Sequence, residues 1–504
     1  MTDAVDAFLL AAIGAPLLGA AFVAAVPNGD RIALRHAGMG AALLALVFGV
    51  LCIRGGLPCS AGSPDIVVGL LLDGAALPAF FAILISTPLA LRAGAPRVQG
   101  GFQGYVIAVL LHESLALIAV CSPTPFVALA AAQLAGVPLF ALLALHGGPQ
   151  RGSTAQRAAS LWLVVDTLGL GTLAFLAGAQ DVPLGAAGVE LADAAAALPG
   201  PLQVVTVVLV LGPGLVRLGA GPHGVWSWTF FEQAPVSAGC LAVAAAAPLG
   251  ANLIGKVLPV AAPGLPAALP TAVTLLVLAA AIGAILILAE KDLRRMIAHL
   301  CGISGAAAAV AVLSLDGDAA AYGSWFTVVA GLSAAAAMMA VEALERRLET
   351  RDATELIGLF SLSPPLAAAL VLGLLGCCGA PVFGSGAALA PMFLAIAAAH
   401  GMAVSGAPPA SSLVVAGGLV LAFATAAAGV AWGCRRLLLM GPKRDRRFVR
   451  VTISQEVRLF IPLAAAAAAA WASPWAVQES RRAVSAQVAQ AHEHLPGSPV
   501  SEEP

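Results

Sequence analysis

The sequence predicts an all-α polytopic membrane protein with about fourteen transmembrane helices. Charged residues make up only 10% of the chain, and the mean hydropathy is +0.96. Soluble domains carry roughly 25% charged residues. Apolar runs of about 18 or more residues recur along nearly the whole chain, and each is long enough to cross a hydrocarbon core of about 30 Å as a helix. A membrane β-barrel would instead show short alternating segments, so we exclude that class.

The individual spans follow from these apolar runs. We place their centres near residues 17, 45, 83, 113, 136, 168, 210, 246, 278, 305, 334, 380, 423 and 467. The opening MTDAVDAFLL carries two aspartates and no basic residue, so it lacks the positive region of a cleavable signal. We interpret it as part of the first span.

The distribution of basic residues predicts the orientation. Lys and Arg concentrate in cytoplasmic loops, and alternate loops of this chain hold most of the 25 basic residues. These are Arg31, Arg35, Arg92, Arg97, Arg151, Arg157, Lys291, Arg294, Arg295, Arg346, Arg347, Arg351 and the cluster at 435–450; Arg54, Lys256, Arg481 and Arg482 fall on the other side. Both termini are therefore predicted outside an inner (cytoplasmic) cell membrane.

The spans suggest five segments and contain no soluble domain. We expect an N-terminal three-helix segment at 1–100, two inverted repeats at 101–256 and 257–410, C-terminal helices at 411–475, and a polar, disordered tail at 476–504.

Two spans are interrupted by glycine and proline. The seventh contains LGPGLVRLGAGPHG and the twelfth contains LLGCCGAPVFGSG, with Pro381 in its break. Paired broken helices at corresponding positions indicate inverted repeats with an ion pathway between them. Gly and Pro are also common in ordinary membrane helices, so a structural interpretation stays open.

Cofactor and nucleic-acid sites are not expected. The eight cysteines are scattered, without the spacing of a zinc or iron–sulfur site, and we expect them to pack in the core. GAGPHG matches a dinucleotide pattern but lies between apolar spans. The basic cluster at 435–450 is typical of a cytoplasmic membrane anchor. We therefore expect no metal, no cofactor and no nucleic-acid partner.

Several blocks resemble the antiporter-like subunits of respiratory complex I (NADH-quinone oxidoreductase). The first is Arg217, Pro222, Trp226 and then Ala-Pro ending at Pro235. AAQLAGVPLFALLALHGG, EKDLRRMIAHLCGIS, ERRLETRDATELIGL and GCRRLLLMGP follow the family's order over about residues 70–475. Chain length and the number of spans are most similar to the M-type subunit. The same blocks are similar to subunits of cation/proton antiporters and membrane-bound hydrogenases.

The resemblance implies a proton relay that this chain does not reproduce. The family places a Glu on helix five, lysines on helices seven and eight, a basic or polar group on helix eleven, and a Lys or Glu on helix twelve. Here the corresponding residues are Gln133, Arg217, Pro248 and Leu389, and helix eleven offers no Lys or His. Arginine holds its proton too tightly to exchange it. We therefore expect a retained scaffold with a degenerate or rewired relay.

Other polar residues inside the spans leave two interpretations open. His112, Glu113, Asp166, Glu232 and His299 form either a rewired ion route or structural pairs across helices. In the first interpretation, Glu113 is one candidate partner for Arg217. Asp292, ahead of Arg294 and Arg295, is predicted to begin a helix at the membrane edge, with contact to a neighbouring subunit as the alternative.

The predicted function is that of a membrane-arm subunit in a complex I-type NADH:quinone oxidoreductase. Its partners would be other membrane subunits, lipid, and protons or other cations, and it would do no redox chemistry of its own. One alternative is the membrane partner of an inorganic-carbon uptake or hydrogenase-type complex. Another is a free-standing cation/proton antiporter.

Overall fold

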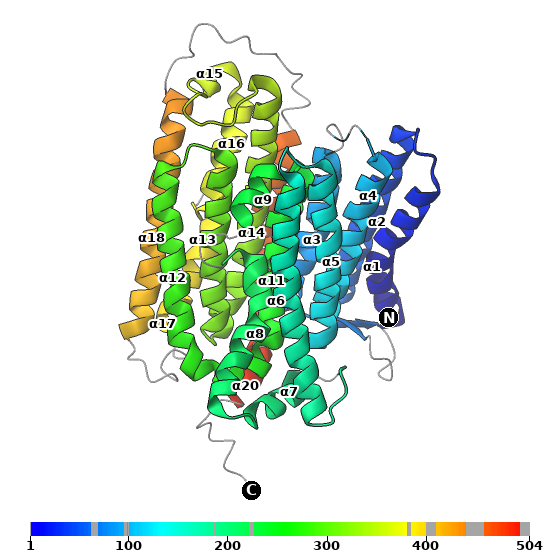
Figure 1. Ribbon diagram of the computed structural model, residues 1–504, viewed down its shortest axis with the longest axis vertical. Coiled ribbons are helices and arrows are strands. Elements are labelled where there is room, and N and C mark those ends of the chain that lie inside the picture. The colour runs from blue at the N-terminus through cyan, green and yellow to red at the C-terminus, as the bar shows by residue number, and fades with distance from the viewer. Residues whose placement is uncertain are drawn as a thin grey trace.

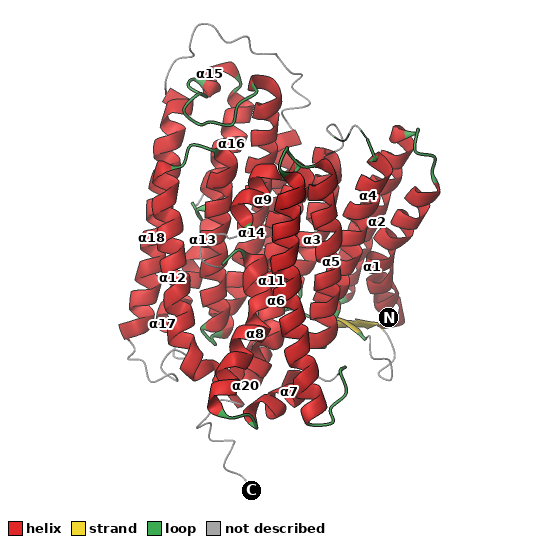
Figure 2. Ribbon diagram, viewed as in Figure 1, coloured by secondary structure: helices red, strands yellow, loops and turns green. Residues whose placement is uncertain are grey.

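Long helices standing side by side make up almost the whole molecule (Figures 1 and 2). The computed structural model describes residues 2–61, 69–94, 98, 100–185, 188–220, 226–380, 385–399, 410–439 and 458–493. Large apolar side chains cover the outside of the bundle, among them Leu18, Phe22, Leu394 and Val414, each more than 60% exposed. Such a surface suits lipid and not water, so the chain is an all-α polytopic membrane protein as predicted.

The first part of the chain forms four long helices and one small hairpin. In order, the elements are α1 (Thr2–Ala25), α2 (Arg31–Gly55), β1 (Cys59–Ala61), β2 (Leu70–Leu72), α3 (Leu77–Gly94) and α4 (Phe102–Cys121). The strands pair antiparallel, with Ser60 opposite Leu71. The Asp30 side chain accepts from the Ala33 backbone N–H and so caps α2.

The next elements include the first interrupted helix. They are α5 (Pro125–His146), α6 (Arg151–Ala179), α7 (Gly188–Ala196), α8 (Gly200–Leu218) and α9 (Ser227–Gln233). The seventh predicted span is thus divided into α8 and α9, which confirms the interruption. Pro222 lies outside the described residues.

A helical stretch of 54 residues, Val236–Ala289, follows the break. It comprises α10 (Val236–Leu241), the π-helical turn η2 (Ala242–Ala246), α11 (Ala247–Ala261), the 3-10 turn η3 (Ala262–Gly264) and α12 (Leu265–Ala289). At 1.5 Å per residue it measures about 80 Å, far more than one crossing needs. Since α11 packs on α7 and α8 while α12 packs on α13 and α18, the chain reverses at η3 and crosses twice.

The π-helical turn has a cause in the sequence. Pro248 has no backbone N–H, and its ring excludes the carbonyl oxygen four residues earlier, at Ala244. The helix widens over Ala242–Ala246, immediately before this proline. Pro248, which the resemblance aligns with a family lysine, therefore reshapes the backbone.

The remaining elements surround two buried helices, α13 (Leu293–Leu313) and α14 (Gly317–Leu348). Within their apolar windows, 89% and 94% of residues are buried. The others are α15 (Leu359–Leu362), α16 (Pro364–Cys377), α17 (Ser385–Ala398), α18 (Ala410–Leu439), η6 (Arg458–Phe460) and α20 (Ile461–Glu493). The second predicted interruption is confirmed between α16 and α17, and Pro381 lies outside the described residues.

The helix lengths accommodate the predicted crossings. Eleven stretches of the described chain are long and apolar enough to span a membrane, and Pro364–Cys377, Gly386–Ala398 and Arg458–Ala470 are shorter apolar helices. The exact number of fourteen, the inverted repeats and the five segment boundaries stay predictions.

The two helix breaks share one backbone geometry. At the first, the N–H of Gly219 donates to Val216 O and that of Ala220 to Leu215 O. At the second, Gly379 donates to Gly376 O and Ala380 to Leu375 O. The glycines have φ of 69° and 66°, a left-handed conformation that glycine adopts without a Cβ penalty. Both half-helices therefore end in the same Schellman motif.

Part of the predicted polar tail is helical. Helix α20 continues to Glu493, and Ser480 on it is fully buried. The Ser480 hydroxyl donates to Gly74 O over 2.7 Å and accepts from the Trp325 indole over 3.1 Å. Arg481 pairs with Asp318 at the start of α14. Helix α20 is thus held against the bundle at Ser480 and Arg481; residues 494–504, like residues 440–450 of the basic cluster, lie outside the described residues.

Candidate functional site

A buried salt bridge lies just before the first helix break. The two terminal nitrogens of Arg217 on α8 donate to the two carboxylate oxygens of Asp166 on α6, over 2.6 and 2.7 Å. The exposed fractions of the two side chains are 1% and 2%. One of these nitrogens also donates to Pro213 O over 3.0 Å. A planar guanidinium matches a carboxylate in this two-bond arrangement, so the geometry holds both charges in place.

Glu113, the candidate partner of Arg217, does not pair with it in the structure. Asp166 occupies both terminal nitrogens of the arginine, because α6 packs directly against α8 and presents this residue to it. Glu113 is fully buried on α4, and neither of its carboxylate oxygens has a hydrogen-bond partner among the described residues.

Aromatic rings enclose the salt bridge and close the break. The Arg217 guanidinium lies 4.8 Å from the centre of the Trp162 ring, which meets Trp226 edge-to-face at 5.2 Å. The Trp226 indole N–H donates to Val216 O over 3.0 Å, so the tryptophan of the motif satisfies one of the terminal carbonyls of α8. Pro235 sits at the N-terminal cap of α10.

Two glycines bring the backbone close to the arginine. A Cβ on Gly214 would lie 2.8 Å from Gly250 O, and one on Gly250 would lie 2.7 Å from Gly214 O. Only glycine permits this approach of α8 and α11, a type of contact common between membrane helices. The close packing leaves little freedom for Arg217 to change position.

The other positions of the expected relay hold no titrating group. Gln133 is half-buried and donates to the Thr167 hydroxyl over 3.2 Å, on the helix that carries Asp166. Pro248 lies in the core after the π-helical turn. Leu389 on α17 packs against Gly379, where a Cβ would approach it to 2.1 Å.

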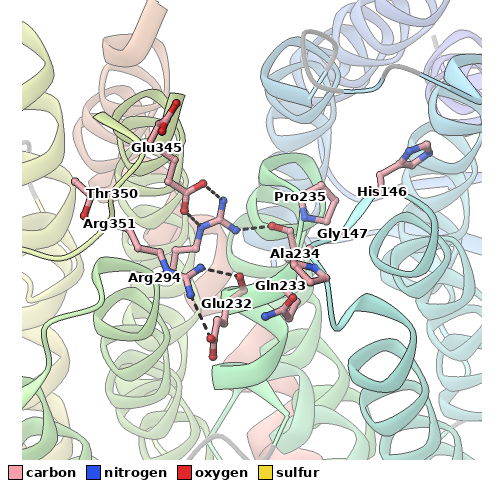
Figure 3. A pocket seen from close by; sticks show the side chains of 13 residues that line it. His146, Gly147, Glu232, Gln233, Ala234, Pro235, Arg294, Glu345, Thr350 and Arg351 are labelled. Atoms are coloured by element: carbon pink, nitrogen blue, oxygen red, sulfur yellow. Dashed lines mark hydrogen bonds and ion pairs between the residues drawn. The ribbon is translucent and has the colours of Figure 1, made fainter. Parts of the chain in front are cut away.

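A second cluster of charges lies at the end of the bundle where α9 meets α13 and α14 (Figure 3). Arg294 donates from two nitrogens to Glu345, both over 2.7 Å, and to Glu342 over 3.3 Å. Its remaining nitrogen donates to the carbonyls of Phe231 and Ala234, over 3.2 and 2.6 Å. All five N–H groups of this buried arginine are therefore used. The C-terminal end of α9 is fixed to α14 through one side chain.

Glu232 joins the same cluster at this end of the bundle. Its carboxylate accepts from Arg295 over 2.9 Å and from Arg351 over 3.2 Å. Arg351 also pairs with Asp292 over 2.6 Å. A cavity of about 480 Å³ opens beside these residues, and Figure 3 shows its lining side chains.

The predicted helix start at Asp292 is confirmed. Its side chain accepts from the backbone N–H groups of Arg294 and Arg295, and a short antiparallel bridge pairs it with Asp352. Burial raises the pKa of Asp292 above its usual value, although Arg351 and the two N–H groups act in the opposite direction. His299 lies 3.8 Å from Glu290 and edge-to-face with Trp228, within this end of the bundle.

Lys256 is a polar residue that the sequence analysis assigned to a loop. It lies on α11, inside a stretch that qualifies as membrane-spanning, and its ammonium donates to Val120 O over 2.6 Å, Ala119 O over 3.3 Å and Ser122 O. The signal for it was available: Pro248, Asn252 and Lys256 are spaced four residues apart and so share one helix face.

Fold and site together define a multi-pass membrane protein with two interrupted helices and an ion pair at the first interruption. A family model described as NADH:quinone oxidoreductase/Mrp antiporter, transmembrane, matches residues 133–413, more than half of the chain. The chain belongs to this family.

Individual relatives agree with that assignment. NADH-quinone oxidoreductase subunit N of Rubrobacter xylanophilus is 27% identical over 318 residues, which span 60% of this chain and 62% of the relative. A chain of respiratory complex I from Thermus thermophilus has the same fold, with a TM-score of 0.81, 18% identity, and coverage of 96% and 99% of the two chains. A chain of an archaeal membrane-bound sulfane sulfur reductase is similar at a TM-score of 0.82, 17% identity, and coverage of 96% and 100%.

Proposed function

We propose that this chain is a membrane-arm subunit of an energy-converting complex of the complex I type, in which the family's proton relay is degenerate. The scaffold supports the first part, since the family match and two interrupted helices accompany folds of respiratory-complex subunits. The chain would bind no cofactor and do no redox chemistry. Its partners would be other membrane subunits in an inner (cytoplasmic) cell membrane, with both termini outside.

The Arg217–Asp166 pair carries the second part of the proposal. A relay needs a group that gives up and regains its proton, whereas arginine keeps its proton at any accessible pH. Asp166 is the opposite charge in a two-bond contact shielded from water. Taking the proton from this pair would leave an uncompensated charge in the core, which is strongly unfavourable. The pair therefore serves as a fixed salt bridge that holds α8 to α6 at the helix break and does not exchange protons.

The experiment is affinity purification of the full chain from its native membrane in mild detergent. We expect other membrane subunits to co-purify, together with a soluble partner whose absorbance reveals flavin or iron–sulfur centres. A soluble partner without redox groups would replace this proposal with a non-redox machine such as an inorganic-carbon uptake complex. A chain that purifies alone and exchanges Na⁺ or K⁺ for protons in vesicles would establish a free-standing antiporter instead.

A further inference from the structure

A small cavity opens where the last turn of α12 meets the last turns of α18, two helices that lie side by side (Figure 1). We call it the α12–α18 notch; its volume is about 140 Å³. It is lined by residues 287–291 at the end of α12, Met296 on α13, residues 353 and 354 of the loop after α14, and Gly429, Trp432 and Gly433 on α18. It shares no lining residue with the cavity of Figure 3, so it is a separate feature of this end of the bundle.

Two glycines of α18 explain why the notch forms. A Cβ on Gly429 would lie 2.9 Å from the Ile287 side chain, so α12 and α18 touch at that level. One turn further on, a Cβ on Gly433 would meet a single atom of the described residues, Met296 Cε, at 3.8 Å. Helix α12 ends at Ala289 and the chain turns into α13, so the two helices separate between these glycines. The buried Met296 forms the floor of the gap that the missing side chains leave open.

The notch lies at the end of two membrane-spanning stretches. The stretch on α18 that qualifies as membrane-spanning ends at Arg435, and the one that contains α12 ends at Ala289. Trp432 lies in the last turn of the first and is 65% exposed, and Leu288 lies in the last turn of the second and is 52% exposed. Tryptophan is typical of the level where acyl chains meet headgroups. The mouth of the notch therefore offers apolar surface at headgroup depth.

Two basic side chains at the notch have no ion-pair partner among the described residues. Lys291 lines the cavity and is exposed. Arg435 is exposed as well, and its guanidinium lies 5.5 Å from the centre of the Trp432 ring. By contrast, Arg294 and Arg295 at the same end of the bundle are both paired with carboxylates. The notch therefore combines apolar surface with two positive charges that the described part of the chain does not neutralise.

The other polar groups that line the notch are occupied by the chain itself. One Glu290 oxygen accepts from the backbone N–H groups of Lys291 and Asp292, over 2.9 and 3.0 Å. Its other oxygen lies 3.8 Å from a ring nitrogen of His299. The Thr354 hydroxyl donates to Asp352 over 2.6 Å. The groups that stay available for a ligand are therefore the two cations, and they would take an anion.

We propose that the α12–α18 notch binds an anionic phospholipid, whose phosphate pairs with Lys291 and Arg435 while an acyl chain lies against Trp432 and Leu288. Lysine and arginine are the usual partners of a phosphate group. Free phosphate offers the same charge, but only a lipid also covers the exposed apolar side chains at the mouth. The inference goes beyond the proposed function and does not depend on which complex the chain belongs to.

The test uses the full-length chain in phosphatidylcholine vesicles to which a brominated lipid is added in rising mole fraction, because bromine quenches the fluorescence of a tryptophan that it contacts. Brominated phosphatidylglycerol should reach half-maximal quenching at about a tenfold lower mole fraction than brominated phosphatidylcholine. Each basic side chain near a membrane surface contributes about fivefold, and the charge of Glu290 offsets part of the total. The chain has seven tryptophans, so Trp432→Phe identifies the signal of Trp432 and should remove this high-affinity quenching.

The double variant Lys291→Gln with Arg435→Gln should lose the preference, as should Gly433→Leu, which fills the notch and keeps both charges. The matched control is Arg35→Gln with Arg157→Gln, which removes two exposed basic residues on other helices and should keep the preference. Equal quenching by the two lipids would overturn the proposal, as would a preference that survives in the first double variant or falls equally in the control. Relief of quenching by millimolar inorganic phosphate would also overturn it, because the notch would then be a site for a soluble anion.

Discussion

Arg217 on α8 and Asp166 on α6 form a two-bond salt bridge, although they are 51 residues apart in the sequence. Both side chains are shielded from water. Such a pair is costly to break on one side, because the remaining charge stays buried. We expect Asp166→Asn to lower the free energy of unfolding by about 3–5 kcal/mol. Thermal unfolding in detergent measures this loss.

The double variant Asp166→Leu with Arg217→Met serves as the comparison. Replacing a buried ion pair by apolar residues of similar volume is often neutral or stabilising. The double variant should therefore melt near the wild type and well above Asp166→Asn. If the double variant costs as much as Asp166→Asn, the two charges are not coupled and the proposed role of the pair is wrong.

Arg294 and Arg295 are adjacent but should differ strongly in their contribution to stability. The exposed fraction of Arg294 is 3% and that of Arg295 is 45%. Arg294→Met removes five hydrogen bonds, two of them to Glu345, and takes away the buried positive charge, so we expect a loss of about 3–5 kcal/mol. Arg295→Met should cost less than about 1 kcal/mol, since exposed ion pairs contribute little. Equal melting temperatures for the two variants would contradict the assignment.

Asp292 and Asp352 are neighbours in a backbone bridge, but their pKa values shift in opposite directions, which predicts two opposite pH dependences. Hydrogen bonds from Thr354 lower the pKa of Asp352, so its stabilisation is present above its unfolded pKa of about 3.9 and is lost as pH falls through the folded value. Burial raises the pKa of Asp292, so its contribution is present below about 3.9 and is lost as pH rises through the folded value.

The measurement is unfolding as a function of pH for the two asparagine variants. The stability advantage of the wild type over Asp352→Asn should shrink toward acid pH. Its advantage over Asp292→Asn should shrink toward neutral pH, and asparagine keeps the helix cap in that variant. Parallel pH profiles for both variants would show that neither carboxyl is perturbed as described.

Gly305 on α13 tests the close approach to the first helix break. A Cβ there would lie 1.9 Å from Leu218 O, so Gly305→Ala must push the two helices apart. Overpacking of this kind costs about 1–3 kcal/mol. Gly417→Ala on α18 is the matched control, because nothing lies within 4 Å of its Cβ position. We expect the control to melt at or above the wild-type temperature and Gly305→Ala to melt below it.

Much of the fold could be predicted because the lipid environment restricts which backbone structures can form. In lipid every backbone group must be bonded internally, so long uncharged runs become helices, and Gly with Pro marks the breaks. The turn at η3 (Ala262–Gly264) lies where the predicted span centres at 246 and 278 place it, although residues 257–289 carry no charge to mark a loop. How the flanking segments pack on their neighbours could not be predicted from the chain.

The candidate site was predictable only in part. The motif located Arg217 and Trp226, since their types and spacing are readable along the chain. The partner of Arg217 was not readable, because Asp166 and Glu113 are both acids in neighbouring spans and only the packing of α6 on α8 decides between them. Likewise, the lack of partners for Glu113 is a property of the assembled bundle.

Helix α13 touches both interrupted helices. Gly305 meets the last carbonyl of α8, and the Ser304 hydroxyl donates to Cys377 O at the end of α16 over 3.1 Å. Two adjacent residues of α13 thus contact the ends of both half-helices, α8 and α16. A shift of α13 along its axis would therefore displace α8 and α16 together. The two helix breaks would be coupled by packing alone, with no charge moving between them.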